Sequence, residues 1–286
     1  MAFEHFIPTV WDEGILVEQE RKCVFLEDCN RQYEGEAKKK GDTVRIIELG
    51  DPTIHTMERK NANGKILDPE EIEDASLSLV IDQLRYYNYK VGDIDKAQAI
   101  GGIMETLKMR TAEKFANEID RYIAKFAIDS NITTMFGKNP VKVVKSENPG
   151  EGEKNVLEIL DDAIQIMQER DITLELVLTA SPRFIKILRQ AYIIRDTDNS
   201  LMLKNGRVGM YGNVTLKMSN NVERSGNGAV DNIMLRTKRA IAFAQTYNES
   251  EAYRPEGYFA DAIKGLTLFG GKIVFPKEVL NLNVRY

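Results

Sequence analysis

The sequence contains very few cysteines and histidines, two of each in 286 residues. The cysteines, Cys23 and Cys29, are too few for the disulfide framework of a small secreted protein, and we expect both to be reduced thiols. The histidines, His5 and His55, are far apart and show no zinc-ligand spacing with the cysteines. A disulfide scaffold, a zinc site and a histidine general base are all unexpected, and we predict no metal and no cofactor.

Long apolar runs and an excess of positive charge are also missing. No apolar run approaches the length of about 18 residues that a membrane-spanning helix needs, and residues 1–6 do not follow the pattern of a signal peptide. The formal net charge is −5 and the pI about 5.4, which argues against a protein that reads DNA. These values remain compatible with a shell that encloses DNA without gripping it.

The sequence also lacks a convincing nucleotide-binding or catalytic motif. Asn63-Gly64-Lys65 resembles the end of a phosphate-binding loop, but the first glycine and the following Ser or Thr are missing, so a turn is the better interpretation. No Ser/His/Asp or Cys/His set stands out, and no two of the many acidic residues are placed together by the pattern. We therefore predict that the protein is not an enzyme.

What the sequence does contain is a long arm with no evident core of its own. Two strand-like runs, residues 42–49 and 75–89, flank the polar stretch 50–74. A two-stranded ribbon alone is marginal in water. Ordering the arm costs roughly 1–2 kcal/mol per residue, which is on the order of 50 kcal/mol in total. The sequence therefore predicts that another copy of the chain supplies the surface on which the arm packs.

Residues 6–11 form a short apolar and aromatic segment near the N-terminus. Pro8 keeps the residue before it extended. Trp11, the only tryptophan, is either an anchor in the core or a contact to a neighbouring subunit, because chain termini often have no core of their own. Phe6 and Trp11 are accordingly candidate subunit contacts.

A long helix is predicted for residues 94–129. Apolar side chains recur there at steps of three and four residues, and Asp93 or Asp95 can cap its start. At about 1.5 Å per residue the helix is roughly 54 Å long, whereas a compact globule of this chain length is about 50 Å across. Either the helix kinks at Gly101-Gly102, or the molecule is elongated.

The remaining sequence predicts an α/β part followed by further strands. A connector rich in Gly and Pro, residues 132–152, precedes a helix, a buried strand and a second helix between residues 156 and 191. The next strands are expected near residues 207–210, 214–218 and 232–235. Residues 262–284 are rich in strand-forming residues, with breaks expected at Gly270-Gly271 and at Pro276.

Several segments of the chain resemble those of tailed-phage major capsid proteins. They lie in the family's order and touch both ends of the chain: residues 6–8 with Trp11, NRQYEGE at 30–36, GDTVRI at 41–46, DIDKAQA at 93–99, and residues 252–255, 259–262 and 264–276. Residues 132–245 match in layout more than in residue identity. The resemblance covers most of the chain and depends on order and spacing.

This resemblance implies an α+β protein with the Hong Kong 97 phage capsid fold. The implied parts are an N-terminal arm (1–30), an extended β-hairpin loop (31–90), a peripheral domain with a long spine helix (91–131 and 247–286) and an α/β axial domain (132–246). In that fold the axial domain packs around fivefold and sixfold centres, while the loop and the arm reach across neighbouring subunits.

The function implied by the resemblance is that of a major capsid protein. Such a protein self-assembles into pentamers and hexamers of an icosahedral head shell, in the virion of a tailed bacteriophage or prophage. The implied partners are a separate scaffolding protein, a portal and packaged double-stranded DNA held without sequence specificity, with no membrane. Assembly is expected in the cytoplasm of the host bacterium.

The resemblance also makes the charged tip of the arm a candidate for salt links between subunits. The candidate subunit contacts are Phe6, Trp11, Glu58, Arg59, Lys60, Lys65 and Arg254. Two alternatives stay open. One is an encapsulin-like shell of a bacterial nanocompartment, which has the same fold. The other is a cytoplasmic α/β enzyme, which predicts a small oligomer with converging polar groups in a pocket.

Overall fold

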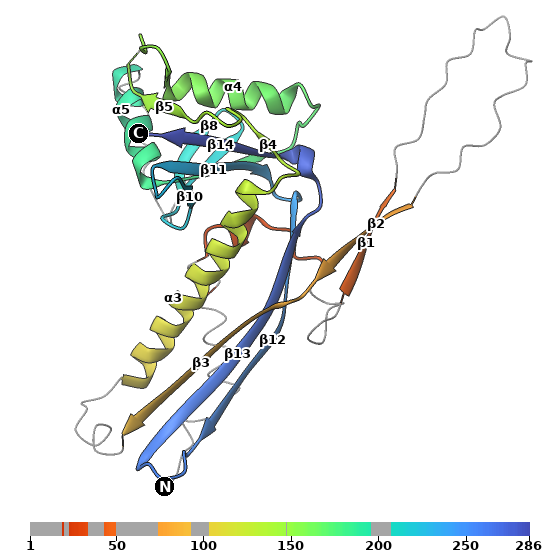
Figure 1. The fold of residues 1–286 in the computed structure, drawn as a ribbon, viewed down its shortest axis with the longest axis vertical. Coiled ribbons are helices and arrows are strands. Elements are labelled where there is room, and N and C mark those ends of the chain that lie inside the picture. The colour runs from red at the N-terminus through yellow and green to blue at the C-terminus, as the bar shows by residue number, and fades with distance from the viewer. Residues whose placement is uncertain are drawn as a thin grey trace, which may run out of the picture.

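Three β-sheets and three α-helices organise the part of the chain that the structure describes. The computed structural model describes residues 19, 23–33, 43–49, 74–92, 103–146, 148–195 and 207–286. Figure 1 shows an elongated molecule, with a long sheet and a long helix below and a larger sheet with two helices above. The mixed α+β class expected from the resemblance is confirmed.

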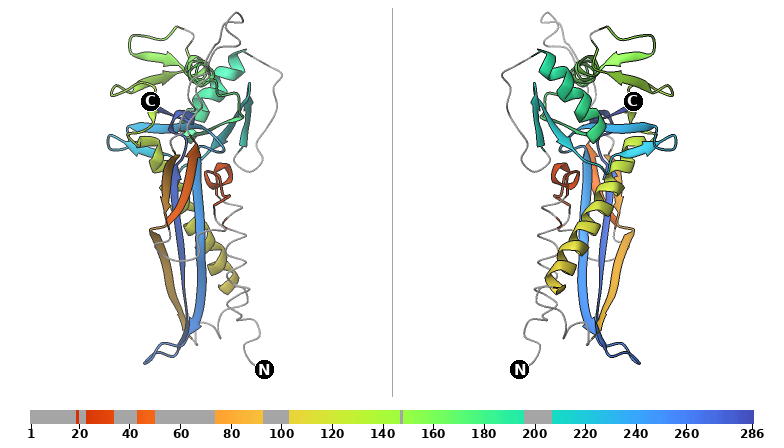
Figure 2. Two further views of the ribbon diagram at one scale, coloured as in Figure 1. Left: turned by 90° about the vertical axis from the view of Figure 1, so that its right-hand side faces the viewer. Right: turned by 90° about the vertical axis from the view of Figure 1, so that its left-hand side faces the viewer.

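The lower part is a three-stranded antiparallel sheet with a helix lying along one face (Figures 1 and 2). Its elements are β3 (Gln83–Gly92), β12 (Ile241–Tyr253), β13 (Ala260–Ile273) and the helix α3 (Ile103–Ala124), and β13 is the central strand. Aromatic rings join the two layers. The ring centroids of Tyr87 in β3 and Phe115 in α3 are 5.7 Å apart, and those of Phe269 in β13 and Tyr122 in α3 are 5.4 Å apart.

The structure describes the long helix from Ile103 onward, and the predicted residues 94–102 lie outside the described ranges. α3 has 22 residues, about 33 Å at 1.5 Å per residue, and the 3-10 helix η3 (Lys125–Ile128) follows it. Ile119 and Ile123 are fully buried toward the sheet while Arg110 and Arg121 are exposed, as the three-and-four spacing predicts. The kink proposed at Gly101-Gly102 lies outside the described residues. The elongated shape agrees with the second of the two predicted alternatives.

The upper part is a nine-stranded mixed sheet with the order β6-β5-β14-β11-β7-β9-β8, to which β10 and β4 add at β11 and β14. The strands are β4 (Thr133–Thr134), β5 (Val141–Val144), β6 (Glu153–Asn155), β7 (Leu176–Ala180), β8 (Arg207–Tyr211), β9 (Val214–Met218), β10 (Glu223–Ser225), β11 (Val230–Thr237) and β14 (Val279–Arg285). The helices α4 (Val156–Gln168) and α5 (Pro182–Arg195) belong to this part. The helices and strands predicted between residues 156 and 235 are all present.

The last strand differs from the sequence-based expectation. Residues 247–286 are expected to belong to the peripheral domain, together with the long helix. In the structure, β14 pairs instead with β5 and β11 at the centre of the nine-stranded sheet. The break expected at Gly270-Gly271 is also wrong, because β13 continues to Ile273. The chain turns instead through residues 274–278, where the short 3-10 helix η4 (Pro276–Glu278) leads into β14.

The root of the arm forms a two-stranded antiparallel ribbon, β1 (Thr43–Leu49) with β2 (Asp74–Val80). The single run predicted for residues 75–89 is two strands in different sheets, with β2 in the ribbon and β3 in the long sheet. The chain passes between them close to β13: a Cβ on Gly270 would lie 2.8 Å from the Cα of Ile81 and would also overlap the carbonyl oxygen of Val80. Only glycine fits this crossing.

The arm root has a core within its own chain. Leu79 and Ile81 are fully buried. They belong to a cluster with Val44 and Ile46 of the ribbon and Leu268 of the long sheet. The prediction that another copy of the chain supplies the surface on which the arm packs is thus wrong for the root of the arm, because Leu268 of the same chain contributes to this core. The rest of the arm, residues 50–73, lies outside the described residues.

Candidate functional site

The described residues contain no recognisable catalytic or metal centre. No group of three or more His, Cys, Asp or Glu side chains in the described ranges is arranged to hold a metal ion. No helix among those residues is long and apolar enough to cross a membrane. The features with functional potential are instead contacts that hold extended elements together and charged surfaces.

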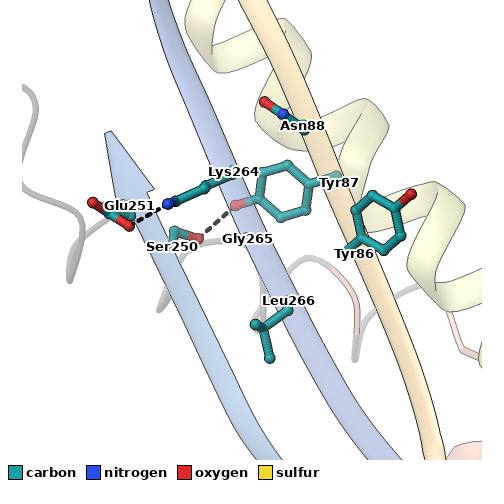
Figure 3. Close-up of a pocket in the computed structure, with 8 residues that line it drawn as sticks. All are labelled: Tyr86, Tyr87, Asn88, Ser250, Glu251, Lys264, Gly265 and Leu266. Atoms are coloured by element: carbon teal, nitrogen blue, oxygen red, sulfur yellow. Dashed lines mark hydrogen bonds and ion pairs between the residues drawn. The ribbon is translucent and has the colours of Figure 1, made fainter. Parts of the chain in front are cut away.

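A hollow of about 340 Å³ lies on the long sheet (Figure 3). Its lining residues are Tyr86, Tyr87, Asn88, Ser250, Glu251, Lys264, Gly265 and Leu266. The only ion pair among them joins Lys264 Nζ and Glu251 Oε2 at 2.7 Å, and both side chains are at least half exposed. This ion pair is exposed and its two charges neutralise each other, and the two hydroxyl groups of the hollow, those of Tyr87 and Ser250, are paired with each other.

The same hollow contains a contact that spans all three strands. Tyr87 of β3, Gly265 of β13 and Ser250 of β12 are directly opposite one another in register. The Tyr87 ring lies over Gly265, and its hydroxyl is 2.5 Å from Ser250 Oγ (Figure 3). A Cβ on Gly265 would come within 2.5 Å of the ring. Glycine at this position therefore leaves the space in which the tyrosine links the two outer strands.

A second candidate feature lies where α3 meets the nine-stranded sheet. The chain forms a turn at residues 24–29, including the 3-10 helix η1 (Leu26–Asp28). Asp120, on the buried side of α3, accepts hydrogen bonds from the backbone N–H groups of Val24 and Phe25, both at 3.0 Å. The carboxylate thereby ties this N-terminal turn to the long helix.

Two buried cations of the nine-stranded sheet hold the other side of the turn. Arg236 of β11 is fully buried and donates to the carbonyl oxygens of Phe25, at 2.6 Å, and Asp28, at 3.0 Å. Lys217 of β9, 2% exposed, forms ion pairs with Asp28 and Glu27. We call Asp120, Lys217 and Arg236 with residues 24–29 the junction cluster. The junction cluster joins the turn at residues 24–29, the helix α3 and the nine-stranded sheet, which are far apart in the sequence.

The junction cluster alters the titration of its acidic groups. Burial raises the pKa of Asp120 to about 6, although the N–H groups of Val24 and Phe25 and the charge of Arg236 act in the opposite direction. Burial likewise raises the pKa of the Cys29 thiol, against the lowering influence of Arg236. Both cysteines are free thiols, as predicted. A raised thiol pKa keeps Cys29 in its unreactive form.

No pattern in the sequence points to the junction cluster. Asp120 was not distinguished from the other charged residues of the helix, and the turn at residues 24–29 has no motif. One signal was available: Lys217 and Arg236 are each the only cation in a strand composed mostly of buried residues. A charge in such a position needs a buried partner.

The structure describes only one of the predicted subunit contacts. Phe6, Trp11, Glu58, Arg59, Lys60 and Lys65 lie outside the described residues. Arg254 is exposed just after β12, in the loop that joins β12 to β13. The same loop exposes Tyr258 and Phe259, the latter 88% accessible. Arg254 is therefore placed where another subunit can reach it.

Comparison with known proteins gives results for structure only. No family model matches the chain, and no curated protein matches it. A solved structure from Mycobacterium phage Che8 has a TM-score of 0.70 and 25% identity, over 91% of this chain and 90% of that one. The capsid structure of cyanophage P-SCSP1u has a TM-score of 0.67 and 13% identity, over 91% and 87%.

The chain has the fold of tailed-phage capsid proteins. The resemblance seen in the sequence is thereby confirmed, and the match extends over nearly the whole of both chains. A virus-like particle from Pyrococcus furiosus is also similar, with a TM-score of 0.59 and 12% identity over 98% of this chain and all of that one. The Che8 and P-SCSP1u structures have both a higher TM-score and a higher identity than this particle.

Proposed function

We propose that this chain is the major capsid protein of a tailed bacteriophage or prophage. The observation that carries the proposal is the similarity to the Che8 structure, which extends over 91% of the chain at 25% identity. The role is structural: many copies of the chain form the icosahedral head shell that encloses double-stranded DNA. The absence of a recognisable catalytic constellation in the described ranges is compatible with this role.

In this proposal the shell consists of pentamers and hexamers. The nine-stranded sheet with α4 and α5 corresponds to the axial part around their centres. The long sheet with α3 corresponds to the peripheral part. The arm and the N-terminal segment reach neighbouring subunits, with Phe6, Trp11, Glu58, Arg59, Lys60, Lys65 and Arg254 as the proposed contacts. A separate scaffolding protein and a portal complete the assembly, which takes place in the host cytoplasm before the shell becomes part of the virion.

Electron microscopy of the expressed protein tests the proposal directly. We expect the chain, alone or together with its neighbouring genes, to form closed shells in negative stain. Deleting residues 52–69 from the arm should leave a soluble protein that forms no shells. A small discrete oligomer under every condition would contradict the proposal and favour the alternative of an α/β enzyme.

A nanocompartment shell remains the second candidate because the Pyrococcus furiosus particle shares the fold. Its lower similarity makes it the weaker alternative. The contents of particles formed in the native host separate the two functions. We expect nuclease-protected double-stranded DNA inside. Particles that contain a protein cargo and no DNA would favour the nanocompartment.

A further inference from the structure

The two helices of the nine-stranded sheet carry opposite charges on their outer faces. The outward side of α4 presents Glu158, Asp161, Asp162 and Glu169 together with two glutamines, and no cation. The outward side of α5 presents Arg183, Lys186 and Arg189, and no acidic residue within its described side chains. Each of these two helix faces therefore carries charges of one sign only.

Most of these charges have no ionic partner among the residues that the structure describes. Asp162 is paired with Lys154 at 3.0 Å, and Asp161 accepts a hydrogen bond from the neutral Tyr211 hydroxyl at 2.6 Å. Within the described ranges, Glu158 and Glu169 have no cationic partner, and the three cations of α5 have no acidic one. Each face therefore carries an uncompensated charge.

The charged faces point away from the contact between the two helices. Buried apolar residues such as Leu160 and Met167 of α4 and Phe184 and Leu188 of α5 form the inner sides and join the main core. Figures 1 and 2 show α4 along the upper edge of this part of the molecule and α5 on its flank. The acidic and basic faces are thus both available to a partner at the same time.

We infer that the acidic face of α4 in one subunit contacts the basic face of α5 in the next copy of the chain. This rests on the proposed function, because rings of identical subunits need two different surfaces that match each other. Opposite charges on one chain provide such a pair. Glu158 and Asp161 are three residues apart on α4, as are Lys186 and Arg189 on α5. Both spacings correspond to a rise of about 4.5 Å, so the two pairs match.

The charged faces of α4 and α5 favour a second copy of this chain over an apolar partner. Among residues 156–168 of α4 and 182–191 of α5, whose side chains the structure describes, no large hydrophobic residue is exposed. A contact based on charge alone is weak and sensitive to salt, which suits a ring closed by several identical contacts. Such a contact also selects its partner strongly, because like charges placed opposite each other are repelled.

Charge reversal and its rescue test the inference. The base-reversed variant carries Lys186→Glu and Arg189→Glu, and the acid-reversed variant carries Glu158→Lys and Asp161→Lys. We expect each to raise the protein concentration at which shells appear by light scattering at least about tenfold. The variant with all four substitutions should return to within about threefold of the wild type, because the faces match again.

A mixture of the two single-face variants gives a sharper result. Opposite faces match only where the variants alternate around the ring. Six-membered rings can alternate, whereas five-membered rings cannot. Negative-stain images of the equimolar mixture should therefore show hexamers and open sheets or tubes without closed shells. Closed shells from the mixture would contradict the inference.

The control variant carries Lys114→Glu and Lys125→Glu, which change two exposed cations of the lower part and shift the net charge by the same amount as the base-reversed variant. It should assemble within about threefold of the wild type, and circular dichroism should show all variants folded. A defect equal to that of the base-reversed variant, or a four-substitution variant that stays defective, would overturn the inference.

The outcome also separates this inference from the proposed function. If the wild type forms shells and both single-face variants assemble equally well, the contact between α4 and α5 is refuted while the capsid function stands. The contact is likewise refuted if the base-reversed variant forms normal shells that contain no DNA. That result would indicate that α5 binds the phosphate groups of DNA. If the wild type forms no shells under any condition, the proposed function itself fails.

Discussion

The junction cluster and the long sheet both hold distant parts of the chain together, but by different means. In the junction cluster, the buried side chains of Asp120 and Arg236 bind backbone groups of a short turn, and buried Lys217 pairs with the carboxylates of that turn. In the long sheet, aromatic rings lie over glycine, and the arm root crosses β13 where no side chain fits. The junction should therefore respond to loss of charge and to pH, whereas the sheet should respond to added volume.

The largest expected effect comes from removing the buried guanidinium of the junction. Arg236→Met leaves the carbonyl groups of Phe25 and Asp28 without their donor and Asp120 without its nearby positive charge. We expect the free energy of unfolding of the unassembled chain to fall by about 3–5 kcal/mol, measured by urea titration. Arg110→Met, on the exposed face of α3, should change it by less than about 0.5 kcal/mol. Equal effects of the two variants would remove the contrast between buried and exposed charge.

The pH dependence of Asp120 gives the next effect. Its pKa is raised to about 6 from an ordinary value of 3.8. The folded state therefore binds this proton more tightly than the unfolded state. The resulting stabilisation is fully present below the unfolded value and is lost as the pH rises through about 6. A raise of this size corresponds to about 2–3 kcal/mol.

Comparison with Asp120→Asn isolates this titration from that of other carboxyl groups. The stability of the wild type relative to this variant should increase by about 2–3 kcal/mol between pH 7.5 and pH 4. Urea titrations at several pH values measure the difference. Glu118→Gln, at an exposed position on the same helix, serves as the control. A wild-type advantage that stays constant with pH would show that Asp120 titrates normally.

In the long sheet, the crossing at Gly270 should tolerate no side chain. Gly270→Ala forces the Cβ against the backbone of Val80 and Ile81. We expect a loss of about 1–3 kcal/mol, as for overpacked cores, together with faster hydrogen exchange in β1 and β2. Gly150→Ala, whose Cβ would meet nothing closer than 3.5 Å, should be within about 0.5 kcal/mol of the wild type. A harmless Gly270→Ala would mean that the arm root does not approach β13 so closely.

The smallest effect concerns the cross-strand tyrosine. Tyr87→Phe removes the hydroxyl that contacts Ser250 and keeps the ring over Gly265. We expect a loss of about 1 kcal/mol. Thermal unfolding of Tyr87→Phe, Ser250→Ala and the double variant measures the coupling between the two groups. Tyr86→Phe, at an exposed position of the same strand, serves as control. Additive losses for Tyr87 and Ser250 would show that their contact contributes nothing.

Local patterns predicted much of the fold. Apolar residues of α3 recur at steps of three and four, and strand-forming residues gather in short runs between residues 207 and 235. Such patterns depend only on neighbouring residues, and the structure contains the elements that they predict. Three features escaped prediction because they depend on distant contacts: the division of residues 75–89 between two sheets, the pairing of β14 with β5 and β11, and the junction cluster. In the sequence Asp120 cannot be told from the other charged residues of the helix, because its partner, the backbone N–H of Phe25, belongs to a distant segment of the chain.

The sequence by itself determined the class of protein. Its composition excludes a disulfide scaffold, and the order of its motifs indicated a capsid protein, because such patterns are carried by residues close together in the chain. Only the tertiary structure decided which charges are buried and which face outward. Arg236 and Arg189 are alike in sequence, yet one stabilises a turn inside the molecule and the other is exposed on α5. The physical reason is that burial and pairing of a charge depend on segments that meet only when the chain folds.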